Sequence, residues 1–291
     1  MAKLNSLSSA LLLILAGSRV ATGIKIHTTT AYCPLPIGSR WCTVHPVGRP
    51  SFTMAVSTGT DIVSQSICSQ GFWETGDISS FGPPGHAVDI GANLGYFTFL
   101  LAHAGWKVWA WEPLTTNLAR MDATFCANPA FKAQITLSRY ALGETPDTCV
   151  MFSGNRNVAN GVVRCGSEGQ MVQQHKPIPG IGTDYTILGT FPVKRLDDVL
   201  QENGMPQVVN FAKLDVEGFE CEVLRGGKKL LGTLRPQLVK TEIWSGQLQM
   251  VQCTREQYMQ MYHDSGYTAG VDPTCSTAPT GASMEYMFCR K

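Results

Sequence analysis

The chain has 291 residues, of which 44% are hydrophobic, and a formal net charge of +1. This length and apolar content suffice to bury one large core, so we expect a single α/β domain behind a short leader. The near-zero charge, and the lack of a basic run interleaved with aromatic residues, argue against a nucleic-acid partner.

Residues 1–23 have the pattern of a targeting leader. Lys3 precedes an apolar run over Leu11–Ala16, and the small residues Ala21–Gly23 follow where a signal peptidase would cleave. We therefore predict a signal peptide and a secretory-pathway or secreted protein, with an organelle-targeting leader as the alternative. The apolar run is shorter than the roughly 18 residues that a membrane span needs, so no stable membrane span is expected.

Residues 24–60 are rich in Pro, Thr and Gly and show little periodicity, which predicts an irregular arm. The rest of the chain, 61–291, is predicted to form the folded domain. It begins with a short helix around Ile62–Ile67, because apolar residues recur there at helical spacing.

The ten cysteines are an even number, which together with the leader favours disulfides and an oxidising compartment. Cys33 and Cys42 form a candidate local pair. Cys253, Cys275 and Cys289 are candidate partners near the C-terminus, and the pairing does not follow from the sequence. Because there is no Cys-x-x-Cys motif and the histidines are scattered, no metal site is predicted.

Strand and helix patterns alternate from residue 88 onward. Predicted helices occupy 96–104, 117–126, 219–231 (interrupted at Gly226–Gly227) and 254–265, and 193–200 has the pattern of a short strand turning into a helix. The first predicted strand ends at residue 90, and six further predicted strands occupy 107–111, 134–142, 208–214, 236–244, 267–271 and 285–289. This alternation predicts a doubly wound sheet.

Residues 143–192 lose clear periodicity and are rich in Gly, Asn and Pro. A segment of this length inside a compact domain is usually a lid, a binding loop or a small added element. We assign it to substrate recognition, with a purely structural role as the alternative.

The stretch 88–98 reads as the end of a buried strand, a glycine turn and the start of a helix. Asp89 closes the strand, and Gly91 and Gly95 let the backbone approach a ligand closely. Glu112 ends the next strand 23 positions after Asp89, near the offset of roughly 20 at which an acid meets ribose hydroxyls. The Gly-x-x-x-Gly spacing differs from the Gly-x-Gly-x-x-Gly of dinucleotide oxidoreductases and favours a ligand without phosphates, such as S-adenosylmethionine.

Six blocks follow one another along residues 85–245. They are Val-Asp-Ile-Gly-Ala-Asn-Leu-Gly (88–95), Trp-Glu-Pro (111–113), Tyr-Ala-Leu-Gly (140–143), Arg-Leu-Asp-Asp (195–198), Lys-Leu-Asp-Val-Glu-Gly-Phe-Glu-Cys-Glu-Val-Leu-Arg-Gly (213–226) and Pro-Gln-Leu-Val-Lys-Thr-Glu-Ile (236–243). In this order the blocks resemble those of the FkbM-type methyltransferases. The resemblance implies a class I, Rossmann-like α/β methyltransferase with a doubly wound seven-stranded sheet, its last strand antiparallel.

The same resemblance implies S-adenosylmethionine as the cofactor and a hydroxyl oxygen as the usual acceptor. It also implies that Asp89, Gly91, Asn93 and Gly95 surround the methionine tail and ribose, that Glu112 holds the ribose hydroxyls, and that Ala141 lines the adenine.

Three carboxylates are the candidate catalytic residues. Asp215 and Glu217 follow the predicted strand 208–214, at the ligand edge of an open α/β sheet. Asp215 could face the cofactor's amino group or the acceptor, and Glu217 could act as the base. The alternative is that both carboxylates cap the following helix. Glu242, at the end of another apolar strand, is a candidate substrate or metal contact.

We expect an O-methyltransferase acting on a carbohydrate or another small hydroxylated molecule. The alternatives are a non-catalytic secreted module that retains the fold and, disfavoured by the glycine spacing, a nicotinamide-dependent oxidoreductase. Trp73 and Trp244 have the chemistry to stack on a sugar, although core packing is the expected role of each. His86 and His103 are interpreted as structural. The acceptor and the oligomeric state do not follow from the sequence.

Overall fold

A computed structural model describes residues 32–59, 61–154, 161–178, 182–202, 204–249, 251–280 and 284–291. The predicted leader, 1–23, lies outside these residues. Among the helices of the described residues, none is long and apolar enough to cross a membrane.

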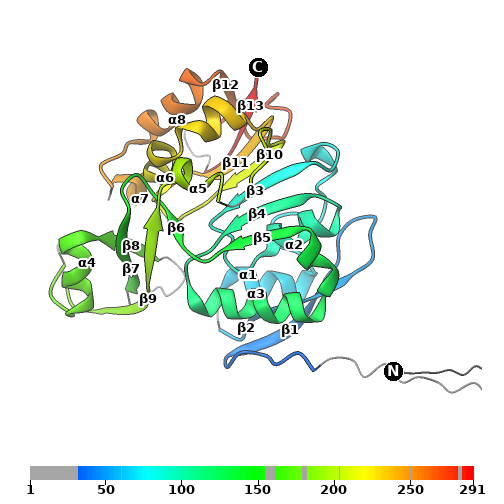
Figure 1. Ribbon diagram of the computed structural model, residues 1–291, viewed down its shortest axis with the longest axis horizontal. Coiled ribbons are helices and arrows are strands. Elements are labelled where there is room, and N and C mark those ends of the chain that lie inside the picture. The colour runs from blue at the N-terminus through cyan, green and yellow to red at the C-terminus, as the bar shows by residue number, and fades with distance from the viewer. Residues whose placement is uncertain are drawn as a thin grey trace, which may run out of the picture. The chain divides into compact units, whose positions relative to one another are not determined.

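Seven strands form the central sheet in the order β12-β13-β11-β10-β3-β4-β5 (Figure 1). They are β3 (His86–Ile90), β4 (Lys107–Trp111), β5 (Ile135–Ser138), β10 (Phe211–Leu214), β11 (Leu238–Glu242), β12 (Tyr267–Gly270) and β13 (Glu285–Arg290). Neighbouring strands pair in parallel except for β13, which is antiparallel to both β11 and β12. The predicted doubly wound sheet with an antiparallel last strand is therefore confirmed.

Helices connect these strands. They are α1 (Ile62–Gln70), α2 (Tyr96–His103), α3 (Thr115–Ala127), α4 (Gly166–Gln173), α5 (Leu196–Val199), α6 (Glu220–Gly226), α7 (Ser245–Gln249) and α8 (Arg255–Asp264), with 3-10 turns at Ser79–Phe81 and Pro129–Ala133 and a π-helical turn at Leu230–Leu234. The predicted helix 254–265 is confirmed as α8, which begins with a capping box between Thr254 and Gln257. The predicted interruption at Gly226–Gly227 is also confirmed, since α6 ends there.

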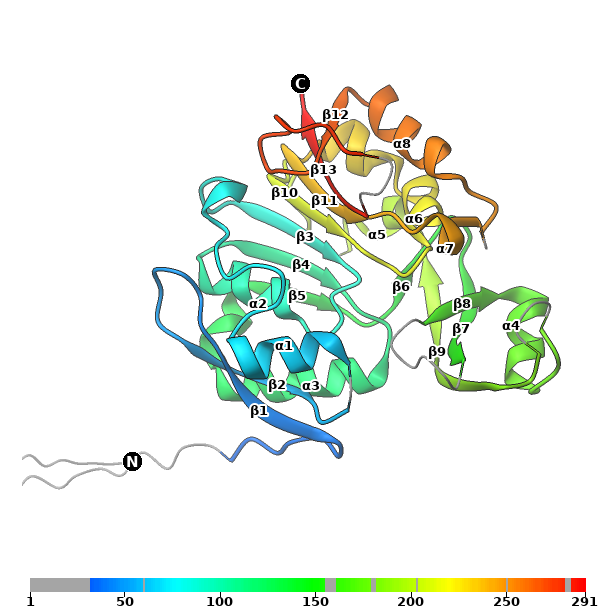
Figure 2. The same ribbon diagram turned by 180° about the vertical axis from the view of Figure 1, so that it is seen from behind.

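Side chains of the central strands alternate between two apolar clusters, one on each face of the sheet. Ala87 and Phe211 belong to the cluster that includes α2, whereas the next residues along the chain, Val88 and Ala212, belong to the cluster that includes α6 and α8. Because successive strand residues point to opposite faces, both faces are buried. Figure 2 shows α6 and α8 on one side of the strands and α1, α2 and α3 on the other.

The segment 143–192 forms most of a second, four-stranded sheet with the order β6-β9-β7-β8, and helix α4 packs against it (Figure 1). Its strands are β6 (Ala141–Leu142), β7 (Asp147–Gly154), β8 (Val162–Cys165) and β9 (Tyr185–Lys194). The predicted continuous strand 134–142 is wrong: the chain leaves the central sheet after Ser138, and Ala141–Leu142 pairs with Val193–Lys194 instead.

The prediction of an irregular arm over 24–60 is wrong for residues 39–57, which form a β-hairpin of β1 (Ser39–Val44) and β2 (Phe52–Ser57). The hairpin packs against α3 and belongs to the same compact unit as the sheet. The buried side chains of β2 explain its stability, and Ala55 N donates a hydrogen bond to Thr124 Oγ1 on α3. Each strand has only six residues, which is too few for an alternating pattern of apolar and polar residues to predict it from the sequence. Residues 24–31 of the predicted arm lie outside the described part of the chain.

Five disulfides use all ten cysteines. They are Cys33–Cys126, Cys42–Cys68, Cys149–Cys165, Cys221–Cys253 and Cys275–Cys289. The candidate local pair of Cys33 with Cys42 is therefore wrong, because each is bonded to a helix that packs near the hairpin. Of the three C-terminal candidates, Cys275 and Cys289 bond to each other and Cys253 bonds to α6.

We expect the Cys33–Cys126 disulfide to stabilise the protein more than Cys275–Cys289, because it closes 93 residues of chain against 14. In the chain-entropy model, replacing both cysteines by Ser costs about 4–5 kcal/mol for the first pair and about 3 kcal/mol for the second. Urea unfolding without reductant measures both values, and a larger loss for the Cys275–Cys289 pair would contradict the expectation.

Candidate active site

A cavity of about 760 Å³ lies at the carboxyl edge of the central sheet. Several residues that line the cavity lie side by side across the sheet in the order of its strands. Glu112 follows β4, Gly91 follows β3, Glu217 follows β10, and Glu242 ends β11. Ala141 lines the end beyond Glu112. Of the predicted site residues, Asp89 and Gly95 do not line the cavity and are placed behind it.

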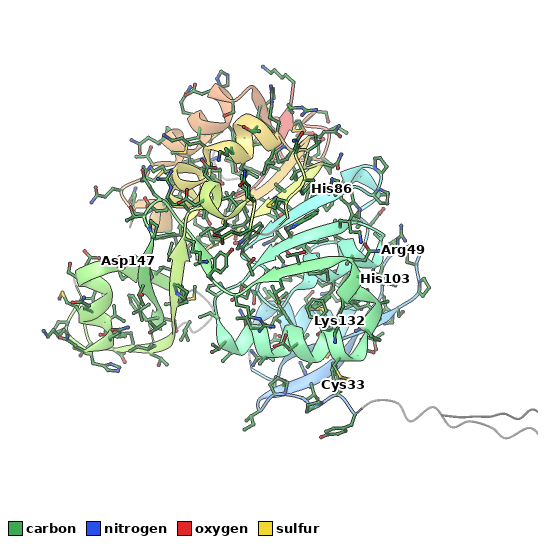
Figure 3. The ribbon with its side chains drawn as sticks, viewed as in Figure 1. Cys33, Arg49, His86, His103, Lys132 and Asp147 are labelled. Atoms are coloured by element: carbon green, nitrogen blue, oxygen red, sulfur yellow. A yellow bond between two sulfur atoms is a disulfide. The ribbon has the colours of Figure 1, made fainter. Side chains whose placement is uncertain are left out.

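His86 and His103 lie at the opposite end of the sheet (Figure 3). His86 begins β3, and its Nδ1 is 3.1 Å from Val208 O. His103 ends α2, and its Nε2 is 2.8 Å from Pro50 O. Both contacts join backbone segments far from the cavity, so the structural interpretation of these histidines is confirmed.

Gly91 follows β3 and contacts the backbone at the end of β10, on the floor of the cavity. Its φ is 85°, and a Cβ there would lie 1.8 Å from Asp215 O, so no side chain fits. The N–H groups of Gly91 and Ala92 both donate to Trp111 O. One turn therefore contacts the ends of β4 and β10 and presents bare backbone to the cavity. Gly95 has a different role, because a Cβ there would meet Phe99 and a core methionine.

Glu112 is buried and already accepts three hydrogen bonds. Asn93 N donates to Oε2 at 2.8 Å, Leu114 N donates to Oε1 at 2.9 Å, and Asn117 Nδ2 donates to Oε1 at 3.3 Å. Burial raises the pKa of Glu112 to about 7, against the lowering effect of these donors. Because a carboxylate offers about four acceptor sites, capacity remains for a ligand hydroxyl.

Lys213 is the main site residue that sequence reasoning missed. It is 7% exposed, it lines the cavity, and its Nζ donates to Asp215 Oδ2 at 2.8 Å. In the strand register Lys213 lies beside Asp89, whose Oδ2 accepts a hydrogen bond from Thr98 Oγ1 at 2.6 Å. The available signal was a lysine in an otherwise apolar strand, which needs a charged partner when buried.

The charges in this cluster shift the pKa values of Asp89 and Lys213. Burial raises the pKa of Asp89, and the positive charge of Lys213 opposes that rise. For Lys213, burial alone would lower the pKa, but the carboxylates of Asp215 and Asp89 outweigh it and raise the pKa. Lys213 therefore stays protonated and holds Asp215 in place.

Glu217 adopts a left-handed backbone conformation with φ of 56°, and Gln247 Nε2 donates to its Oε2 at 3.1 Å. Burial and the neighbouring charge of Asp215 raise the pKa of Glu217 to about 8. Glu220 stabilises the loop that carries Glu217, because Glu220 Oε1 accepts hydrogen bonds from Val216 N and Gly218 N. No side chain caps α6, so the capping alternative for Asp215 and Glu217 is wrong.

Glu242 lines the cavity beside Trp244, and burial raises its pKa. Trp244 is 41% exposed, so the expectation of core packing is wrong for this residue. Trp73 packs partly against the core and also lines the cavity. In the described part of the chain, no group of three or more His, Cys, Asp or Glu side chains is arranged to hold a metal ion.

The second sheet supplies an apolar wall of the same cavity, through Met151, Val163, Ile187, Phe191 and Val193. It reaches the central domain where β9 packs on the loop after β4, since a Cβ on Gly189 would lie 2.9 Å from Leu114 Cδ2. The segment 143–192 is therefore a wall of the site as well as a structural element.

Comparison with known proteins assigns the family. A family model described as the methyltransferase FkbM domain matches residues 89–265, more than half of the chain. The comparison with curated proteins finds no significant match.

Several solved structures are distantly similar. They include precorrin-6y C5,15-methyltransferase from Geobacter metallireducens (10% identity, 73% of this chain and 85% of that chain, TM-score 0.39), an rRNA methylase from Streptococcus thermophilus (11%, 73% and 91%, 0.38) and an O-methyltransferase family protein from Burkholderia thailandensis (10%, 74% and 53%, 0.39). These similarities are too distant to carry an argument about substrate. The domain match is sufficient by itself: this chain belongs to the FkbM methyltransferase family.

Proposed function

We propose that the protein is an S-adenosylmethionine-dependent methyltransferase that methylates a hydroxyl oxygen of a sugar or another small hydroxylated molecule. One observation carries the proposal: a side-chain-free glycine turn, a buried ribose-type carboxylate and the Asp215–Glu217 pair line a single cavity. The match to the methyltransferase FkbM domain supports the same reaction class.

The residues fit the cofactor. Gly91 leaves backbone that a ligand can approach closely, Glu112 has acceptor capacity for a ribose hydroxyl, and Ala141 with the apolar wall of the second sheet suits an adenine. Behind the turn, the buried Oδ1 of Asp89 has no hydrogen-bond partner within the protein. Because Asp89 does not line the cavity, its charge would act on a cationic ligand group from behind the turn, without direct contact.

S-adenosylmethionine supplies a methyl group on a positively charged sulfur. In our proposal the protein then has two tasks. It holds the acceptor hydroxyl in line with that methyl group, an orientation effect that contributes up to about 7–11 kcal/mol in model reactions. It also removes the hydroxyl proton, and Glu217 is the base because it lies beside Asp215 in the cavity with a raised pKa.

We also propose that the protein works in the secretory pathway or outside the cell. All ten cysteines form disulfides, which persist in oxidising compartments. The leader-like pattern of residues 1–23 supports the same location.

Calorimetric titration with S-adenosylhomocysteine tests cofactor binding. We expect the wild type to bind it and Glu112→Ala to bind it about 10- to 100-fold more weakly, because a hydrogen bond to a charged group contributes roughly 1.5–3 kcal/mol. Glu168→Ala, which removes an exposed carboxylate from α4, serves as the control and should bind like the wild type. Failure of the wild type to bind, or binding of NAD in its place, would contradict the proposal.

The pH dependence of turnover tests the base. We expect kcat/KM to rise with pH through an apparent pKa at or below about 8, because Glu217 accepts a proton only when ionised and a cationic donor lowers its pKa. Glu217→Gln should lose this pH dependence and about 10²–10⁴ in kcat. Unchanged affinity of the variant for S-adenosylhomocysteine separates this loss from misfolding, whereas wild-type turnover in the variant would exclude Glu217 as the base.

A further inference from the structure

The turn 73–75 lines part of the cavity and lies outside the residues that the family model matches. Trp73 and Glu74 both line the cavity, but the family model begins only at residue 89. Glu285, which also lines this end, follows the last matched residue, 265. This part of the cavity wall therefore lies outside the residues that the family model matches.

The turn is held rigidly in an unfavourable conformation. Glu74 has φ of 54°, a left-handed conformation that costs a residue other than glycine of order 1–3 kcal/mol. Tyr96 Oη donates a hydrogen bond to Thr75 O at 2.7 Å. Strain of this kind persists only where surrounding contacts enforce it, and it is concentrated at ligand sites.

A buried lysine fixes the Glu74 carboxylate. Lys240 is 5% exposed on β11, and its Nζ lies 2.7 Å from Glu74 Oε2 and 3.2 Å from Glu285 Oε2. The backbone of Lys240 pairs with that of Lys213 in the sheet, so neighbouring strands each carry a buried lysine bound to a cavity carboxylate. Glu74 is thereby positioned as firmly as Asp215.

The strand order places this turn at the acceptor end. Of the proposed nucleoside contacts, Glu112 follows β4 and Ala141 begins β6, and the proposed base follows β10. Glu74 and Glu285 instead lie at Lys240 of β11, next to β13. An acceptor bound on the side of Glu217 away from the nucleoside would therefore lie within reach of Trp73 and Glu74, which line the cavity there.

The chemistry of this end suits an uncharged sugar ring. A carboxylate accepts charge-assisted hydrogen bonds from hydroxyls, and a tryptophan face packs against the C–H groups of a pyranose. Glu74, Glu242 and Glu285 outnumber Lys240 here, so a carboxylate or phosphate on the acceptor would meet like charge, which costs affinity.

We propose that Glu74 is a specificity-determining residue that accepts a hydrogen bond from a hydroxyl of an uncharged sugar acceptor packed on Trp73, and that Lys240 is its positioning residue. This inference rests on the proposed function. It narrows the acceptor to neutral sugars and excludes uronic acids and sugar phosphates as preferred acceptors.

The test uses the full chain, a labelled methyl donor and paired probes: the methyl glycosides of glucose, galactose and mannose, and the corresponding methyl uronides. We expect the wild type to methylate at least one neutral glycoside with a kcat/KM at least tenfold above that of its uronide. Glu74→Gln should raise the KM for that glycoside about tenfold and reduce the discrimination against the uronide. Its kcat and its affinity for S-adenosylhomocysteine should stay within twofold of the wild type.

Two further variants test positioning. Lys240→Met should raise the KM in the same way as Glu74→Gln, whereas Lys240→Arg, which keeps the ion pair, should restore it to near the wild-type value. Glu202→Gln is the matched control, because it removes one carboxylate from the exposed Lys194–Glu202 pair outside the cavity lining. Its kinetic constants should not change.

The outcomes separate the two proposals. If the wild type methylates a neutral glycoside but Glu74→Gln leaves KM and selectivity unchanged, the role of Glu74 is wrong and the proposed function stands. Equal or faster methylation of the uronide overturns the charge argument. Binding of S-adenosylhomocysteine without methylation of any glycoside overturns the sugar acceptor in both proposals, and a lack of binding overturns the proposed function itself.

Discussion

The site depends on the close approach of two backbone segments, the turn after β3 and the end of β10. Parallel pairing of these central strands brings Gly91 against Asp215 O, and only a residue without a side chain permits that approach. The approach places the proposed cofactor turn and the proposed catalytic carboxylates on one cavity floor. Any shift in the pairing of β3 with β10 would separate them.

A row of charges beneath this floor keeps the approach in place. Asp89, Lys213 and Lys240 are register partners on β3, β10 and β11, and each lysine binds a carboxylate that lines the cavity. Burying charges is costly, and removing one partner from such a pair leaves an uncompensated charge. Loss of one member of the row would therefore be costly, and in our proposal the two lysines orient Asp215 and Glu74.

Three elements surround the central sheet: the hairpin of β1 and β2, the second sheet and the turn 73–75. The hairpin is attached by disulfides to α1 and α3, and the second sheet contributes the apolar wall of the cavity. All three elements contribute residues to the lining of the cavity, the hairpin through Ser57 at the end of β2. In our proposal these surrounding elements choose the acceptor, in keeping with the general rule that function lies in sites built on a common fold.

Local sequence patterns were enough to predict the central sheet, and they placed the glycine turn, Glu112, Asp215, Glu217 and Glu242 at the edge of the sheet where the cavity lies. The reason is that strand periodicity and the parallel arrangement together put the ends of these strands on one edge. Only the tertiary structure decided the disulfide partners, the splitting of 134–142 between two sheets, and the recruitment of Trp73, Glu74 and Lys213 to the cavity. Each of these features depends on contacts between residues far apart in the chain. Such contacts produce no periodic pattern in the local sequence from which they could be predicted.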